Sequence, residues 1–427
     1  MVTARSIEAL AEAAESQAGP GTVRPGTAAD AIDEVVPRLI VEPPDAERIG
    51  TTLAWAGREK LRVVVRGGGT KLGWGPPPEA VDLILSTRRL DAVVEHRYGD
   101  LTATVQAGAA LGRVNRQLGG HGQWIPLDLP WSEHATIGGI VATNESGPRR
   151  HRHGAPRDLI IGVGLARTDG HLVKAGGIVV ENVADSDLAK LLTGSFGCLA
   201  VIVTATFKLA PLAPHSRTVA VGLPALNRVG PLVADLLARQ LAPTAVELQL
   251  PPPRVLIRFE SVEATAVAQQ ASDAAELAEG HGGKTEVVAG DEERALWEAH
   301  ARRPWEGAGA VVKLSLRPGD LQATLTWLEE ATRTRRVAYE LAGRAGLAVL
   351  YLRLDGAAEA QAELVTTLRG RLSAGHGSAM IMRGAPQLKS LVDVWGPIGD
   401  GLRIMQEVKS RFDPTGVLNP GRGPGGL

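Results

Sequence analysis

The sequence predicts an α+β protein of two or three domains, and three observations carry this prediction. The chain has 427 residues, more than one ordinary domain holds. A β-branched run at 63–65 ends in three successive glycines, a pattern typical of a strand that leads into a ligand-binding turn. The middle of the chain twice follows the order strand, helix, strand, strand, helix, strand. That order is ferredoxin-like and predicts one large antiparallel sheet with helices on one face.

Composition excludes several classes of protein. The formal net charge of −1 gives no argument for binding nucleic acid or an anionic membrane. Cys198 is the only cysteine, so this chain can form no internal disulfide and cannot hold an iron–sulfur cluster with four cysteines of its own. No apolar run reaches the ~20 residues that span a bilayer. We expect a cytoplasmic protein with no membrane span of its own, free or held at a membrane through a partner.

The elements before residue 213 are short. The N-terminal stretch to Ala18 predicts an amphipathic helix, because charged residues interrupt it too often for a signal peptide. Pro211 and Pro214 close this first part of the chain. Periodicity predicts strands at 37–43, 63–65, 81–85, 101–106 and 201–206, and helices at 44–57 and 110–118.

The glycine turn after the 63–65 strand is the first candidate site. Its amides can converge on one anion, and the flanking Arg66 and Lys71 would add positive charge. It is not a P-loop, because Lys71 is followed by Leu72, and the prolines at 76–78 forbid the helix of a dinucleotide fingerprint. We predict a seat for a pyrophosphate, with a plain turn between strands as the alternative. The candidate residues are Arg66, Gly67, Gly68, Gly69, Thr70 and Lys71.

A second cluster of small and hydrogen-bonding residues spans 134–147 (HATIGGIVATNESG). Small side chains let a planar ligand and its phosphates approach the backbone. A loop followed by a short buried segment is the alternative. The basic stretch 149–157 could hold phosphate or face a partner, although a solvated loop is the favoured interpretation. His151 and His153 lack a third ligand at suitable spacing, so no metal site is predicted.

The rest of the chain contains the two βαββαβ sets and, after them, a C-terminal helix and turn. Apolar positions over 398–412 predict an amphipathic helix that Asp413-Pro414 stops, and the turn at 416–421 would pin the last residues onto another domain. The first βαββαβ set predicts strands at 218–223, 244–250, 255–260 and 284–288, with helices at 226–240 and 262–278. After a connector at 290–309, the second predicts strands at 310–316, 336–341, 347–354 and 378–382, with helices at 321–332 and 357–373.

Five motifs together carry a resemblance to a known family. They are RGGGTK (66–71), VQAG (105–108), ATIGG (135–139), GSFG (194–197) and FDPTGVLNPG (412–421). In this order and spacing the chain resembles FAD-linked oxidases of the vanillyl-alcohol-oxidase (PCMH) type. Within that superfamily it is most similar to the FAD-binding subunits of bacterial glycolate oxidases. The likeness is strong over about 33–213, including the segment 176–197, and over the C-terminal helix, and it is weak through the middle of the chain.

The resemblance implies a division of the chain and a set of cofactor contacts. We expect an N-terminal extension (1–32), an FAD domain of two α+β subdomains (33–213), a cap of two βαββαβ units (214–385) and a C-terminal helix and turn packed on the FAD domain (386–427). The loops at 66–71 and 136–139 would hold the pyrophosphate. The residues assigned to the second loop, the ribityl chain, the flavin and the neighbouring strand are Thr136, Ile137, Gly138, Gly139, Thr143, Asn144, Gly147, Val201 and Ile202.

Some residues depart from the family pattern. Covalent relatives carry a flavin-linking histidine just after the glycines, whereas this chain has Thr70, so the resemblance implies non-covalent FAD. The other departures lie near the expected cofactor edge. Glu181, Asp185 and Ser186 stand where the subunit has Lys, Gly and Tyr, and Ala200 replaces a glycine.

Oxidation of a 2-hydroxy acid requires a cation for the carboxylate, a base for the hydroxyl proton and a flavin that accepts the hydride. Catalytic relatives have a histidine-rich stretch late in the cap, but the matching region here is SAMIMRGAP (378–386). The remaining candidates are Arg353, Arg383 and His376. Ordinary packing within the cap is the alternative role for both arginines.

The missing histidines favour a subunit over a complete enzyme. The chain would bind FAD within an assembly, a second flavoprotein would oxidise a small hydroxy acid, and an iron–sulfur subunit would carry electrons away. One alternative is a self-sufficient flavin oxidase or dehydrogenase of another alcohol or hydroxy acid. Another, suggested by Glu181 and Ala200, is a scaffold subunit that has lost FAD.

Overall fold

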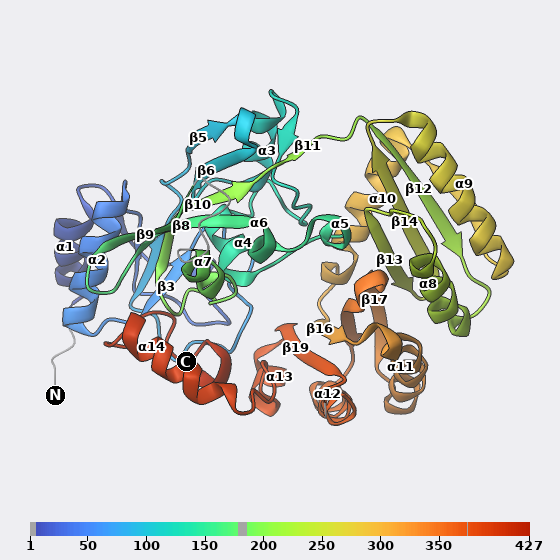
Figure 1. Ribbon diagram of the computed structural model, residues 1–427. Helices are drawn as coiled ribbons and strands as arrows, with labels where there is room; N and C mark the ends of the chain where they lie inside the picture. Colours follow the sequence, from blue (N-terminus) through green and yellow to red (C-terminus); the bar gives the residue numbers. More distant parts are fainter. Residues whose placement is uncertain (1–5, 178–185, 374) are drawn as a thin grey trace. The chain divides into compact units, whose positions relative to one another are not determined.

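The computed structural model describes residues 6–177, 186–373 and 375–427 (Figure 1). The chain divides into two compact units. Unit 1 comprises the chain up to Glu145, Ala155–Leu212 and Pro397–Leu427, and unit 2 comprises Ser146–Gly154 and Ala213–Gly396. The sequence-based boundaries had assigned 146–154 to the FAD domain and 386–396 to the C-terminal segment. Within the described ranges, no helix is both long and apolar enough to cross a bilayer.

The first subdomain of unit 1 is a four-stranded sheet in the order β1-β2-β4-β3, parallel except for β1. The N-terminal helix α1 belongs to it and is no separate extension, because its apolar side chains Leu10, Ala14 and Ala18 are fully buried beside α2. Asp45 starts α2 by accepting a hydrogen bond from the Arg48 amide. The elements are α1 (Ile7–Ala18), β1 (Val23–Pro25), β2 (Leu39–Val41), α2 (Ala46–Glu59), β3 (Val63–Arg66) and β4 (Leu83–Ser86).

The second subdomain is an antiparallel sheet in the order β5-β6-β10-β8-β9. Alternating apolar side chains of β6, such as Ala103 and Val105, enter a core shared with α3, α4 and α7. The larger elements are β5 (Val93–Arg97), β6 (Thr102–Gln106), α3 (Leu111–Gly119), α4 (Ile137–Thr143), β8 (Ile160–Ala166), β9 (Leu172–Gly176), α7 (Ser186–Leu192) and β10 (Val201–Lys208). Smaller ones are β7 (Gln123–Trp124), α6 (Pro156–Leu159) and β11 (Ala210–Pro211). The two α+β subdomains expected from the sequence are therefore present.

The C-terminal segment returns to unit 1. Helix α14 (Gly401–Phe412) is shorter and more exposed than its apolar spacing suggested, with only Val408 and Phe412 packed against the core. The turn after it adds to the edge of the first sheet: the Val63 amide donates to the Val417 carbonyl over 2.8 Å, and the Asn419 amide donates to the Val63 carbonyl over 2.8 Å. The prediction that this turn pins the last residues is confirmed within unit 1.

Unit 2 is built on one antiparallel sheet in the order β15-β12-β14-β13-β17-β18-β16-β19. Each half has the ferredoxin-like strand order, and β13 joins β17 between them. The predicted pair of βαββαβ units is confirmed. The strands are β12 (His215–Gly222), β13 (Ala245–Leu250), β14 (Arg254–Ser261), β15 (Lys284–Val288), β16 (Ala310–Leu316), β17 (Ala338–Arg344), β18 (Val349–Asp355) and β19 (Gly377–Arg383).

Helices cover one face of this sheet, as predicted, but one further helix lies on the other. The covering helices are α9, α8, α11 and α12, and each contacts the next one in that order (Figure 1). The residues predicted as a connector instead form α10 (Gly290–Arg302), whose Trp297 packs against Ala220, Ala245 and Leu256. The helices of unit 2 are α5 (Arg150–His153), α8 (Val229–Ala238), α9 (Ala264–Gly280), α10, α11 (Leu321–Arg335), α12 (Ala358–Leu372) and α13 (Pro386–Leu391).

A substitution at Lys409 can test which interactions hold the C-terminal turn in place. Its buried Nζ donates to the carbonyls of Cys198 and Leu418 and pairs with Asp413 at 2.6 Å. Lys409→Met leaves the buried Asp413 carboxylate without its cation, so we expect a loss of about 3 kcal/mol in the free energy of unfolding, measured by urea denaturation. The control on the same helix is Arg403→Met. Arg403 is 88% exposed, so its loss should cost less than ~0.5 kcal/mol. Equal losses in the two variants would contradict this role.

Candidate cofactor site

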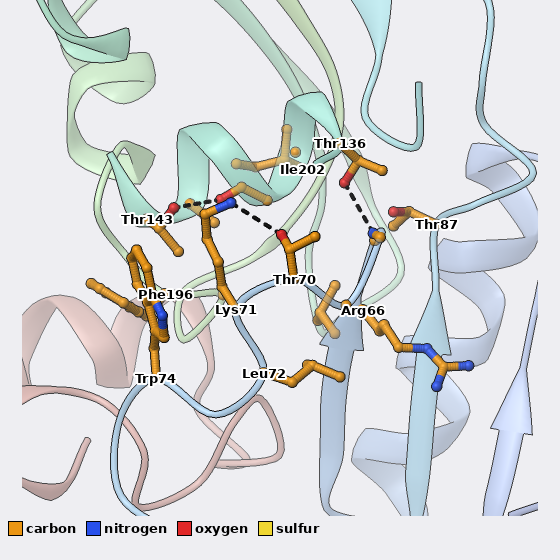
Figure 2. A pocket seen from close by; sticks show the side chains of 18 of the residues that line it. Arg66, Thr70, Lys71, Leu72, Trp74, Thr87, Thr136, Thr143, Phe196 and Ile202 are labelled. Carbon is orange, nitrogen blue, oxygen red and sulfur yellow. Dashed lines mark hydrogen bonds between the residues drawn. The ribbon is translucent and has the colours of Figure 1, made fainter. Parts of the chain in front are cut away.

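A pocket in unit 1 opens where β3 ends. The open space at this place amounts to about 860 Å³, part of which is open solvent. Four segments distant in sequence form most of its wall: the glycine turn, Thr136 with helix α4, the 196–202 segment and the C-terminal turn (Figure 2). Eleven of the fifteen cofactor residues named from the sequence line it: Arg66, Gly67, Gly68, Gly69, Thr70, Lys71, Thr136, Gly138, Gly139, Thr143 and Ile202.

The first two glycines of the turn are required by packing. A Cβ on Gly67 would lie 2.0 Å from Thr136 Oγ1, and a Cβ on Gly68 would lie 1.7 Å from the His134 carbonyl oxygen. Gly69 has a φ of +81°, a backbone conformation that glycine adopts without strain. The turn therefore lies directly against the 134–136 segment, and the Gly68 amide reaches Thr136 Oγ1 at 3.4 Å. This contact is drawn in Figure 2.

The second predicted loop is partly helical. Residues 137–143 form α4 after an extended Thr136, whereas the sequence suggested a loop at 136–139. Gly138 allows this helix to pack closely, since a Cβ there would lie 2.9 Å from the Ala107 Cβ. The amides of Ile137 and Gly138 donate to the carbonyls of Ala109 and Ala107 and are not free for a phosphate. By contrast, within the described chain the amides of Gly69 and Thr70 have no hydrogen-bond acceptor.

The two cations of the glycine turn are already ion-paired. Arg66 lies 2.9 Å from Asp30 and points away from the side chains of Lys71 and Thr143 (Figure 2). Arg24 and Arg66 together hold the pKa of the Asp30 carboxyl well below its usual range. Lys71 lies 2.6 Å from Glu145, and both side chains are largely buried. Burial lowers the pKa of Lys71 to about 8. The surplus positive charge expected from the sequence is therefore largely balanced.

The C-terminal turn supplies two pocket residues that sequence analysis did not select. Arg422 donates to the carbonyls of Leu72, Trp74 and Pro76 and so braces the segment after the glycines. Asn419 donates from Nδ2 to the Phe196 carbonyl over 2.8 Å. Its buried Oδ1 has no hydrogen-bond partner among the described residues. Asn419 lies within the C-terminal motif at 412–421 and Arg422 directly follows it, so this motif is the sequence signal for both residues. The pocket also includes Val65, Leu72, Trp74, Thr87, Ala142, Phe196, Gly197 and Ala200.

Four predicted cofactor residues lie outside the pocket. Ile137 and Val201 are buried in the cores of unit 1. Asn144 ends α4 with a φ of +48°, and its Oδ1 accepts a hydrogen bond from the Arg157 amide. Gly147 belongs to unit 2, where its carbonyl accepts a hydrogen bond from Arg344.

The structure describes only some of the residues that depart from the family pattern. Ala200 lines the pocket. Glu181 and Asp185 lie outside the described residues. Ser186 is the first residue of α7, and its side chain is not described.

The three catalytic candidates are engaged in contacts within unit 2. Arg353 pairs with Glu340 at 2.9 Å and Asp355 at 3.2 Å. His376 lies 2.9 Å from Asp320. Arg383 donates to the carbonyls of Trp305, Gly307 and Gly309 at 2.6 to 3.2 Å. These contacts favour packing roles for both arginines, and a catalytic role for any of the three stays a prediction.

The sequence favours a solvated loop for the basic stretch 149–157, but the structure shows that most of its basic side chains are at least partly buried. Arg149 makes a bidentate pair with Glu260, with distances of 2.8 and 2.6 Å. Burial alone would raise the pKa of Glu260, but the bonds from Arg149 outweigh it and hold that pKa at about 2. His151 packs against Gly346, and burial lowers its pKa. Only Arg152 and Arg157 among the basic residues of this stretch are exposed.

Two family models match the chain. Residues 37–176 match the model described as "FAD binding domain", and residues 333–422 match "FAD linked oxidases, C-terminal domain". The chain belongs to the FAD-linked oxidases. It is an FAD-dependent oxidoreductase with the PCMH-type fold.

Named relatives and a solved structure agree with this assignment. The chain is 26% identical to a D-lactate dehydrogenase of Archaeoglobus fulgidus over 419 residues, covering 90% of each chain. It is 33% identical to the glycolate oxidase subunit GlcE of Escherichia coli over 154 residues, which cover 36% of this chain and 43% of GlcE. A structure of alkyldihydroxyacetonephosphate synthase superimposes with a TM-score of 0.72 at 14% identity, covering 94% of this chain and 83% of the other. The last comparison concerns the fold alone.

The residues of the pocket fit FAD. The glycines leave a cradle that a Cβ would fill, the amides of Gly69 and Thr70 are available to an anion, and Asn419 presents an unpaired acceptor. Trp74 and Phe196 add flat apolar surface, which suits an aromatic ring system.

The glycine cradle can be tested with two alanine variants. Gly68→Ala places a methyl group against the His134 carbonyl, so the turn must move and we expect FAD affinity to fall roughly tenfold or more. The matched control is Gly73→Ala, where a Cβ meets nothing within 4 Å. Flavin bound per chain after gel filtration is the measurement, and circular dichroism checks that both variants are folded. If the Gly68→Ala protein retains as much FAD as Gly73→Ala, the glycine turn is not part of the FAD site.

Proposed function

We propose that the chain holds FAD non-covalently in the unit 1 pocket and takes part in oxidising a small 2-hydroxy acid, with the electrons passed to a partner. The observation that carries the proposal is the glycine cradle with its free amides, which shares one pocket with the unpaired Asn419 Oδ1. Two relatives support the substrate class, because one is named a D-lactate dehydrogenase and the other a subunit of glycolate oxidase.

Backbone groups would do most of the cofactor binding. Because Arg66 and Lys71 are paired with Asp30 and Glu145, the amides of the turn are the groups left to meet a pyrophosphate. Bound FAD would supply the group that accepts the hydride and its electrons, because the chain's own side chains have no such group. The described lining contains neither histidine nor cysteine, which supports a non-covalent attachment.

The role of a subunit is favoured over that of a complete enzyme. The region that matches the histidine-rich stretch of catalytic relatives has no histidine at 378–386. Arg353 and Arg383 are engaged by carboxylates and carbonyls. A second flavoprotein and an iron–sulfur subunit would complete the assembly. The self-sufficient alternative keeps one specific support, since the D-lactate dehydrogenase matches the chain across 90% of both lengths.

Purification of the chain alone separates these alternatives. We expect a yellow protein that releases its flavin on acid precipitation, because the attachment is non-covalent, and that does not oxidise glycolate or D-lactate with an artificial electron acceptor. Activity should appear when a partner flavoprotein and an iron–sulfur protein are added.

Three outcomes would each contradict one part of the proposal: the subunit role, the non-covalent attachment or the binding of FAD. Turnover by the isolated chain would favour the self-sufficient enzyme. Flavin that stays with the acid-precipitated protein would contradict the non-covalent attachment. A colourless protein that takes up no added FAD would favour the scaffold.

A further inference from the structure

Three basic residues line the described wall of the cofactor pocket, and they differ in what their charged ends contact. Arg66 is paired with Asp30 and points away from the side chain of Lys71 (Figure 2). Arg422 donates to three backbone carbonyls. The ammonium group of Lys71 instead donates to Thr70 Oγ1 over 3.1 Å. Because the amide of the same Thr70 has no acceptor within the described chain, an anion held there would lie close to the charge of Lys71.

A buried carboxylate neutralises this ammonium group. Lys71 Nζ lies 2.6 Å from Glu145 Oε2, and the two side chains are 9% and 3% exposed. Glu145 itself is not part of the described pocket wall. Its Oε2 has no hydrogen-bond partner among the described residues, so the contact is an ion pair without hydrogen-bond geometry. In the part of the chain that the structure describes, neither side chain pairs with another charged group.

The ion pair brings no net charge to a pocket that is proposed to receive the negative charges of a pyrophosphate. If Glu145 were neutral, the ammonium group of Lys71 would attract this anion. If Lys71 were neutral, the carboxylate of Glu145 would repel it. Both effects are stronger here than at an exposed site, because the two buried side chains are poorly screened by water. Loss of one partner or of the other should therefore change anion binding in opposite directions.

We propose that Glu145 competes with the pyrophosphate of FAD for the charge of Lys71 and so limits the affinity of the pocket for its cofactor. In the cofactor-free protein the same carboxylate stabilises the fold, because a buried ammonium group without a counter-ion is unfavourable. Glu145 thus acts as an internal substitute for the anion of the cofactor. The inference rests on the proposed binding of FAD in unit 1, and it requires neither the substrate class nor a partner subunit.

Titration of the full chain with FAD, after removal of its flavin and at about pH 6.5, tests the proposal. Lys71 is charged at this pH, because burial lowers its pKa only to about 8. We expect Glu145→Gln to bind FAD roughly tenfold more tightly than the wild type, and Lys71→Met to bind it roughly tenfold more weakly. The double variant removes both charges and should bind FAD within about threefold of the wild type. An affinity that is unchanged or lower in Glu145→Gln would overturn the proposal.

Thermal unfolding of the same cofactor-free proteins separates competition from a purely structural role. Each single variant leaves one buried group without its partner, so both should unfold about 3 °C below the wild type. The double variant leaves neither charge and should unfold close to the wild-type temperature. Stability therefore falls in both single variants, whereas FAD affinity rises in one and falls in the other. Single variants that both lose stability and both lose affinity would show a structural role only and would contradict the proposal.

Titration with ADP assigns the effect to the pyrophosphate, because ADP carries that group without the flavin ring. The order of affinities among the wild type, the two single variants and the double variant should be the same for ADP as for FAD. The control Glu95→Gln removes a partly exposed ion pair with Arg97 on β5 of the same unit, and it should change neither affinity nor stability. Equal ADP affinities in the wild type, Glu145→Gln and Lys71→Met would contradict a competition for the pyrophosphate.

The titration and the turnover assay can fail independently. Opposite shifts of FAD affinity in the two single variants, in a protein that oxidises no 2-hydroxy acid with any partner, would reject the proposed reaction and leave the role of Glu145. Oxidation of a 2-hydroxy acid by a protein whose FAD affinity is the same in the wild type and in Glu145→Gln would leave the proposed function and reject that role. A chain that binds neither FAD nor ADP would reject both.

Discussion

The close contact between the glycine turn and the 134–136 segment is the constraint on which the cofactor pocket depends. Two Cβ positions, at Gly67 and Gly68, would lie within 2.0 Å of atoms of that segment. Any side chain would separate the two subdomains of unit 1 at this point. The same contact leaves the amides of Gly69 and Thr70 without protein acceptors. The close packing of the turn and its two unbonded amides are thus two results of one backbone arrangement.

Charge is distributed differently in the two units. At the glycine turn, each basic residue has a carboxylate: Asp30 for Arg66 and Glu145 for Lys71. On the sheet of unit 2, by contrast, Glu247 is bonded to His300 through Oε2, and its buried Oε1 has no hydrogen-bond partner among the described residues. A neutral wall suits a cofactor that is held permanently through its backbone contacts.

Sequence patterns predicted those parts of the molecule that depend on local periodicity. The two ferredoxin-like halves and the glycine turn fall into this class, since strand alternation and glycine clusters are visible along the chain. Helix α10 was missed because its packing depends on Trp297 meeting Ala220, Ala245 and Leu256 across the sheet. The partners Asp30 and Glu145 were missed for the same reason, as 36 residues separate Asp30 from Arg66.

The return of the C-terminal turn to β3 has a consequence for the order of synthesis. Unit 1 begins at the N-terminus, yet Asn419 and Arg422 complete its pocket only after all of unit 2 has been translated. Until then the edge of β3 lacks the backbone partners at Val417 and Asn419. A ribosome-bound chain can therefore fold the ferredoxin-like halves before the flavin pocket exists. With FAD held in this pocket as proposed, loading of the cofactor would be a late step in the maturation of the protein, after the final turn has been translated.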